Sequence, residues 1–220
     1  MSMHPSPFHD QLDALQQDVL KMGTIVEQAL DEAVRALAVG DLEAAQRVIA
    51  GDDELDRMEI EIEQTCLTLI ALHQPLAGDL RVLGTALKLV TDIERIGDHA
   101  VDIAKVVIRL DAEPLIKPLI DIPEMADVVR RMLRECLSAY VRRDPTLARE
   151  VMGLDDQVDH LYSKVFRDLL ARMIESPDKT RQGAYLLLVA QYLERVGDHA
   201  TNFGEWIVYM VTGERVDLNA

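Results

Sequence analysis

The chain has 220 residues, and its 49% of hydrophobic residues is enough to bury a sizeable core and too much for a disordered chain. Its 39 acidic and 23 basic residues give a net charge of −16, which argues against nucleic acid and anionic membrane surfaces as partners, since both attract basic patches. No apolar stretch approaches the roughly 20 residues that span a bilayer, and residues 1–8 lack the pattern of a secretory signal, so we expect a cytoplasmic protein with no membrane insertion.

Apolar residues recur every three or four positions through three long segments of the first half, which is the spacing of amphipathic helices. The segments cover about 8–39, 42–72 and 76–110. Gly40 ends the first and Pro75 separates the second from the third, because glycine favours helix ends and proline cannot continue helical hydrogen bonding. We expect three helices and no strand in this half.

The second half repeats this plan after a connection rich in proline. The helices expected there cover about 124–143, 145–176 and 178–212. The halves align at an offset of 103 in their first two helices, which places Asp41 over Asp144, and at an offset of 100 in the third. A duplicated three-helix unit explains both offsets. We therefore predict an all-α fold of two tandem three-helix bundles, with a first repeat over 1–110, a linker over 111–123 and a second repeat over 124–220.

Two stretches in the last helix of each half are nearly identical. They are Glu94-Arg95-Ile96-Gly97-Asp98-His99-Ala100 and Glu194-Arg195-Val196-Gly197-Asp198-His199-Ala200. They stand 100 positions apart and differ only at Ile96 and Val196. Because residues four apart lie above one another on a helix, each stretch stacks a glutamate over an aspartate on one face.

Acidic ladders, meaning acids four residues apart, occur on the last two helices of each half. Their members are Asp52 and Asp56, then Glu94, Asp98 and Asp102, in the first half, and Asp155 and Asp159, then Glu194 and Asp198, in the second. At 100° per residue, the acids of the third helix point about 100° to 180° away from the core direction. Like charges at this spacing destabilise an isolated helix, so a compensating cation is expected. Oxygen-rich sites suit hard ions such as magnesium, calcium and manganese, and also iron.

A single ladder on an exposed helix face commonly serves solubility alone, but four ladders at duplicated positions favour cation sites. His99 and His199 follow the acids. On the helical wheel each points about 100° away from the preceding aspartate, so completing a metal site and a neighbouring polar role are both open.

The other shared residues of the two stretches also have two readings. Arg95 and Arg195 are expected to pair with neighbouring carboxylates, and contact with a partner or an anion is the alternative. Gly97 and Gly197 each cost a helix about 1 kcal/mol relative to alanine. Their repetition therefore indicates the close approach of another helix or of a metal cluster, and packing alone is sufficient to explain it.

The segment Pro75-Leu76-Ala77-Gly78-Asp79-Leu80-Arg81, together with the two Glu-Arg-x-Gly-Asp-His stretches, resembles the PhoU family of phosphate-transport regulators. The resemblance extends over nearly the whole chain. It implies a cytoplasmic negative regulator of phosphate uptake and of the phosphate-starvation response. Such proteins are commonly dimers and link the ATPase subunit of the phosphate ABC transporter with the sensor histidine kinase.

The resemblance also implies multinuclear metal clusters on the bundle surface, with iron as the first expectation and zinc, manganese or magnesium as alternatives. By position, the implied ligands are Asp52, Asp56, Glu94 and Asp98 in one set, and Asp155, Asp159, Glu194 and Asp198 in the other. In the second half Tyr162, Phe166 and Asn202 replace acids of the first, which leaves equal occupancy of the two sets open.

No glycine-rich phosphate loop is present, and no nucleophile beside a base can be recognised, so we expect a binding protein and not an enzyme. Two alternatives remain. A carboxylate-bridged metal oxidase would use a Glu-x-x-His pair, whereas each histidine here comes five residues after the glutamate. A phosphotransfer bundle would use an exposed His99 or His199.

Overall fold

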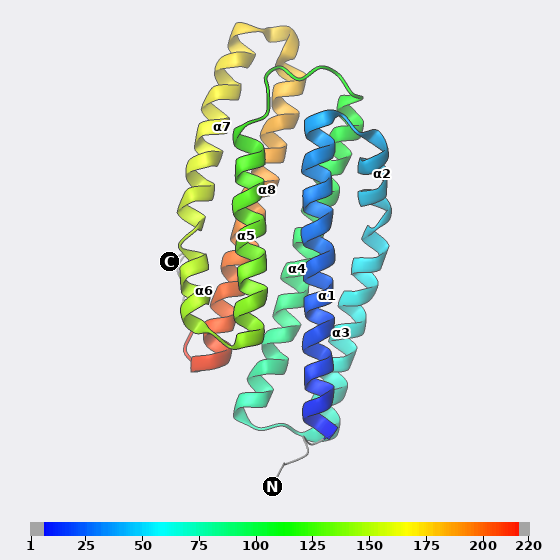
Figure 1. The fold of residues 1–220 in the computed structure, drawn as a ribbon, viewed down its shortest axis with the longest axis vertical. Helices are drawn as coiled ribbons and strands as arrows, with labels where there is room; N and C mark the ends of the chain where they lie inside the picture. Colours follow the sequence, from blue (N-terminus) through cyan, green and yellow to red (C-terminus); the bar gives the residue numbers. More distant parts are fainter. Residues whose placement is uncertain (1–6, 216–220) are drawn as a thin grey trace.

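The structure, a computed structural model, describes residues 7–215, and these form α-helices and one short 3-10 turn without any strand (Figure 1). The helices of the first repeat are α1 (Pro7–Val39), α2 (Leu42–Ala50), α3 (Asp52–His73) and α4 (Ala77–Leu110). Those of the second are α5 (Asp121–Arg142), α6 (Pro145–Met152), α7 (Asp155–Glu175), η1 (Pro177–Lys179) and α8 (Thr180–Thr212). The predicted all-α class is confirmed.

The prediction of one continuous helix after each first helix was wrong, because both break at a glycine. The N–H of Gly51 donates to the carbonyls of Arg47 at 3.1 Å and Val48 at 3.2 Å, which closes α2, and α3 then begins at Asp52. Gly153 closes α6 in the same way before α7 begins. Acidic residues fill the first turns of α3 and α7, where the positive end of the helix dipole favours them.

Helix α5 begins at Asp121, three residues before the predicted start at 124. Proline is tolerated in a first turn because its missing N–H has no helical partner there, so Pro123 does not delay the helix. The buried carboxylate of Asp121 binds Lys164 at 2.8 Å and Lys117 at 3.5 Å. These ion pairs hold the connecting segment against α7, and the hydrogen bond from Lys164 lowers the pKa of Asp121.

The two repeats lie side by side, with α4 and α8 in contact at the centre (Figure 1). Helices α1 to α3 pack around α4, and α5 to α7 pack around α8. One apolar core passes through both repeats and includes the fully buried Leu30, Ile93, Leu133 and Leu193. We call the contact between α4 and α8 the seam, and it positions every cross-repeat contact described below.

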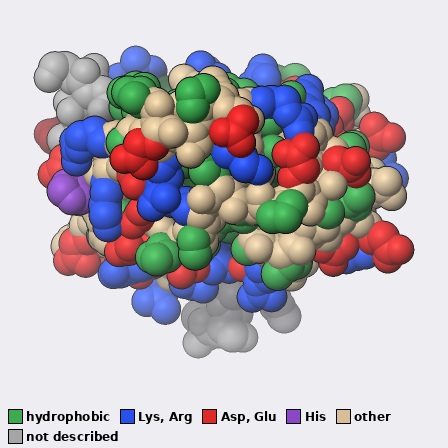
Figure 2. All heavy atoms as spheres, turned by 90° about the horizontal axis from the view of Figure 1, so that it is seen from above, with side chains coloured by type: hydrophobic (Ala, Val, Ile, Leu, Met, Phe, Trp, Pro, Cys, Tyr) green, Lys and Arg blue, Asp and Glu red, His purple; other side chains and the backbone are tan. Residues whose placement is uncertain are grey.

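Seen from the end where segment 111–120 crosses between the repeats, acidic, basic and apolar side chains are intermixed (Figure 2). Neither sign of charge covers this end of the molecule. Within residues 7–215, no helix combines the length and the apolar character needed to cross a membrane.

Candidate functional site

The first acidic cluster lies where α3 packs on α4, and it contains Asp52, Asp56, Glu59, Glu94 and Asp98. The helices approach closely there because Gly97 has no side chain. A Cβ atom at Gly97 would lie 2.7 Å from Leu55 Cδ1 and 3.5 Å from Val26 Cγ2. The predicted close approach of another helix at this glycine is confirmed.

The pKa values of two acids in the first cluster are raised by burial and by neighbouring carboxylates. Burial raises the pKa of Glu94 to about 7, and the charges of Asp98, Glu59 and Asp56 add to the effect. Burial also raises the pKa of Asp52, with Asp98 of the facing helix as the next cause. The side chain of Glu94 is only 15% exposed, so the ladders of α3 and α4 share one half-buried field of negative charge.

Two cations border the first cluster. Arg95 Nη1 lies 3.1 Å from Asp98 Oδ2, and Arg95 Nε lies 3.5 Å from Glu94 Oε2, which confirms the predicted pairing of this arginine. Lys105 Nζ lies 3.5 Å from Asp102 Oδ1. Asp102 is thus engaged with a lysine on its own helix, apart from the acids that raise the pKa of Glu94.

The second acidic cluster contains Asp155 and Asp159 of α7 with Glu194 and Asp198 of α8. Gly197 permits the approach, since a Cβ atom there would lie 3.2 Å from Asp155 Oδ1. Burial raises the pKa of Asp155 to about 6, followed by the charges of Asp159 and Asp198. Burial and then Asp198 raise the pKa of Glu194. The structure therefore brings together all four acids that the sequence assigned to this set.

The second cluster has fewer charged neighbours than the first. Tyr162 and Phe166 occupy the positions of Glu59 and Glu63 of the first repeat. Arg195 slightly offsets the rise that burial causes in the pKa of Glu194, yet it forms no ion pair within 4.0 Å with any carboxylate of residues 7–215. The predicted pairing is thus confirmed for Arg95, whereas no ion pair of Arg195 is present among the described residues.

Among the described residues, no group of three or more histidine, cysteine, aspartate or glutamate side chains stands in an arrangement that holds a metal ion. The donors themselves are suited to one, because each cluster presents only carboxylate oxygens, which hard cations prefer. Burial, and then neighbouring carboxylates, raise the pKa values of Glu94 and Asp155, so a bound cation would offset the cost of keeping these acids charged. Metal ligation by these residues stays a prediction that requires the side chains to turn toward a common ion.

The two histidines of the repeated stretches meet at the seam, where His99 is buried and His199 is partly exposed, so the phosphotransfer alternative loses His99 as an exposed histidine. His99 is only 8% exposed and stacks on Tyr192 with ring centroids 5.7 Å apart. Its pKa is lowered to about 4, first by burial and then by His199. His199 Nδ1 lies 3.0 Å from Asp92 Oδ1, and the two imidazole rings are 5.9 Å apart.

Asp92 is a residue that the sequence reasoning did not select. It occupies the same repeat position as Tyr192, since 192 minus 92 equals the repeat offset of 100. Each of the two therefore contacts the histidine of the opposite repeat. One feature of the sequence points to these two residues: each lies seven residues, or about two helical turns, before a histidine on the same helix face.

The cysteines offer no nucleophile. Both are buried and unpaired, and burial raises the pKa of Cys66 to about 12. Burial raises the pKa of Cys136 as well, and its Sγ donates to the carbonyl of Ala200 at 3.4 Å. Neither thiol ionises near neutral pH, so both act as small core residues.

Comparison with known proteins gives one consistent family. A family model described as the PhoU domain matches residues 19–107 and again 122–207. A phosphate-specific transport system accessory protein PhoU homolog from Clostridium acetobutylicum is 42% identical over 213 residues, which cover 96% of this chain and 97% of the relative. A protein of the same name from Aquifex aeolicus is 39% identical over 94% of this chain and 93% of its own.

Two crystal structures resemble the fold closely. That of PhoU from Pseudomonas aeruginosa has a TM-score of 0.90 at 35% identity and covers 94% of this chain and 100% of its own. That of the phosphate transport system regulatory protein PhoU from Streptococcus pneumoniae has the same TM-score of 0.90, at 31% identity over 96% of this chain and 100% of its own.

Proposed function

We propose, from the premise that this chain belongs to the PhoU family, that it is an accessory protein of phosphate transport that restrains phosphate uptake and the phosphate-starvation response. It would act in the cytoplasm as an adaptor between the ATPase subunit of the phosphate ABC transporter and the sensor histidine kinase, and it would work as a dimer. The observation that carries the proposal is the match of both repeats to one family over nearly the full chain.

The two acidic clusters support an adaptor that acts by binding. Each places carboxylates from two helices on one surface, and each lies at the same position in its repeat. Both thiols and His99 are withdrawn from solvent, whereas His199 is 24% exposed and bonded to Asp92. Surfaces rich in negative charge suit basic segments of a partner protein or metal ions.

We further propose that the clusters hold metal ions, iron first and zinc, manganese or magnesium as alternatives. Asp52, Asp56, Glu94 and Asp98 would hold one group of ions, and Asp155, Asp159, Glu194 and Asp198 the other. A bound ion would supply positive charge that neutralises the carboxylates. Glu59, whose pKa is raised by burial and by Glu63, would join the first group because its charge also acts on Glu94.

The proposal is tested by elemental analysis of protein purified without chelator, beside the double variants Glu94→Gln with Asp98→Asn and Glu194→Gln with Asp198→Asn. We expect each variant to lose one portion of the bound metal. The variant Asp10→Asn with Asp13→Asn removes the same charge from exposed positions of α1 and serves as the control. Metal that both cluster variants retain at the level of the control would refute the metal sites.

The adaptor role has its own readout, which is stoichiometric co-purification with the kinase and with the transporter ATPase. We expect the cluster variants to bind these partners more weakly than the control variant does. Equal binding by all variants would leave the accessory role in place and remove the clusters from the contact surface.

A further inference from the structure

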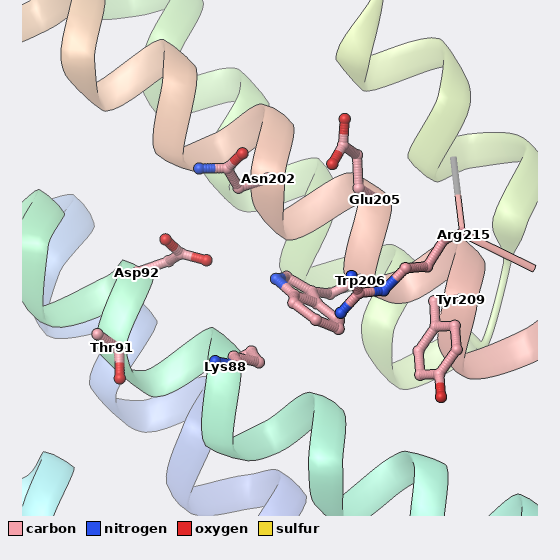
Figure 3. A pocket seen from close by; sticks show the side chains of 8 residues that line it. All are labelled: Lys88, Thr91, Asp92, Asn202, Glu205, Trp206, Tyr209 and Arg215. Carbon is pink, nitrogen blue, oxygen red and sulfur yellow. The ribbon is translucent and has the colours of Figure 1, made fainter. Parts of the chain in front are cut away.

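A pocket of about 450 Å³ opens at the seam (Figure 3). None of the five acids of the first cluster or the four of the second lines it, although its lining residue Thr91 is hydrogen-bonded to Glu59. Lys88 and Asp92 reach it from α4, Trp206 and Tyr209 reach it from α8, and Arg215 follows α8. Its volume lies within the range of about 300 to 1,000 Å³ that is usual for small-molecule sites. Because both repeats line it, a ligand there would contact α4 and α8 together.

An aromatic wall forms one side of the pocket. The rings of Trp206 and Tyr209 stand nearly perpendicular, at 85° with centroids 5.9 Å apart. The wall is held from behind, because Thr85 Oγ1 donates to the carbonyl of Trp206 at 3.5 Å and Arg81 Nε donates to the carbonyl of Met210 at 3.2 Å. A partly exposed indole in a fixed position suits stacking by a planar ring once a cation that lies over it turns to the ligand.

Two cations stand at the same indole. Lys88 Nζ is 5.8 Å from the centroid of Trp206, and Arg215 Cζ is 5.1 Å from it. Neither side chain forms an ion pair within 4.0 Å with a carboxylate in the described part of the chain. In a protein of net charge −16, two cations that converge on an aromatic ring instead of on acids indicate an anionic ligand.

Fixed polar groups line the other end of the pocket. The carboxylate of Asp92 is 15% exposed, and its Oδ1 is held at 3.0 Å by Nδ1 of His199. The amide of Asn202 lies across the pocket from it (Figure 3). A carboxylate and an amide can accept hydrogen bonds from sugar hydroxyls or from an exocyclic amine of a base.

We propose that this pocket binds a nucleoside monophosphate. The base stacks on Trp206, the phosphate lies between Lys88 and Arg215, and the ribose or the base amine donates to Asp92 and Asn202. The acids Asp92 and Glu205 at the lining oppose further negative charge, which favours one phosphate over two or three. This inference goes beyond the proposed regulatory function and does not depend on the metal sites.

The test uses the full chain and its single tryptophan, Trp206, as the reporter. Intrinsic fluorescence is titrated with AMP and with GMP, and in parallel with inorganic phosphate, ribose 5-phosphate, adenosine and ATP. We expect saturable quenching by the monophosphates. Adenosine should bind at least about tenfold more weakly than AMP, because it lacks the phosphate that contacts the two cations. No saturable change with either monophosphate up to millimolar concentration would overturn the proposal.

Variants assign the contacts by calorimetry, which needs no tryptophan signal. Lys88→Gln should weaken AMP binding about tenfold, the scale of one charged hydrogen bond, and Trp206→Leu should weaken it similarly through lost stacking. Lys105→Gln, an exposed lysine farther along the same helix, should leave binding unchanged. Equal affinity for inorganic phosphate and AMP, or unchanged AMP binding by Lys88→Gln, would overturn the proposal even if Trp206→Leu proved unstable.

Discussion

The two acidic clusters occupy the same position in the two repeats, yet their surroundings differ. In each cluster a glycine of the long central helix, α4 or α8, lets the neighbouring helix, α3 or α7, lie close to it. The first cluster also contains Glu59 and is bordered by Arg95 and Lys105. The second has Tyr162 and Phe166 as neighbours, and its arginine, Arg195, forms no ion pair among the described residues. The two repeats thus share the close contact of these helices at a glycine, while the charged residues around that contact differ.

The divergence changes which acid has the most strongly raised pKa. In the first cluster burial raises the pKa of Glu94 on α4 to about 7. Burial and Asp98 also raise the pKa of Asp52, and Lys105 partly offsets this rise. Position 205, which corresponds to Lys105, is glutamate, so the second cluster lacks this cation. There the pKa of Asp155 on α7 rises to about 6. The clusters should therefore differ in how strongly they respond to pH and to added cations.

The largest expected loss of stability comes from truncating the apolar side chains that pack against Gly97 and Gly197. Leu55→Ala should destabilise the protein by about 3 kcal/mol through a core cavity, because Leu55 is 3% exposed. Val158, its counterpart at an offset of 103, is also buried, and Val158→Ala should cost less because it removes fewer carbon atoms. Urea unfolding of both variants measures the difference. Equal losses would mean that the second contact carries as much packing as the first.

The glycines themselves give a smaller effect. Gly97→Ala should cost about 1 kcal/mol net, because overpacking against Leu55 exceeds the gain in helix propensity. Gly197→Ala should cost less, since its nearest neighbour atoms are 3.2 and 3.3 Å away instead of 2.7 Å. In a Leu55→Ala background the cost of Gly97→Ala should vanish, as a double-mutant cycle would show. An additive result would place the strain somewhere other than the Leu55 contact.

These contacts also mark how far the sequence could predict the molecule. The duplication, the convergence of the ladders and the close approach at Gly97 followed from spacing alone. The breaks at Gly51 and Gly153 did not, because both glycines have right-handed helical dihedral angles and leave no turn signature. The bond between Asp92 and His199 depends on how α4 and α8 are rotated against each other, and helical periodicity within one segment does not determine that rotation.

A still smaller effect separates the clusters by pH. The raised pKa of Glu94 means that the folded protein holds this proton more tightly, so its contribution to stability is present below the ordinary value of 4.5 and is lost as the pH rises to about 7. Glu94→Gln should therefore raise the melting temperature of chelator-treated protein at pH 8 and leave it nearly unchanged near pH 4.5. For Asp155→Asn the same change should be complete by a pH of about 6.

The control for this pH series is Glu54→Gln, an exposed acid in the first turn of α3 outside both clusters. It should show no rise in melting temperature at pH 8. A divalent cation that binds the clusters should reduce the advantage of Glu94→Gln, since it supplies the neutralisation that the substitution otherwise provides. Parallel curves for Glu94→Gln and the unsubstituted protein across this pH range would contradict the raised pKa of Glu94.

The smallest expected effect concerns the two arginines. Arg95 is 57% exposed, and its pairs with Glu94 and Asp98 are surface ion pairs, so Arg95→Gln should cost at most about 1 kcal/mol. Arg195→Gln should cost less, because Arg195 acts on its cluster from a greater distance. Both losses of stability should be smaller in 1 M salt, where the Debye length is about 3 Å and surface ion pairs are screened. Melting temperatures of the two variants at low and high salt measure this, and a larger loss from Arg195→Gln would reverse the order of charge compensation that separates the two clusters.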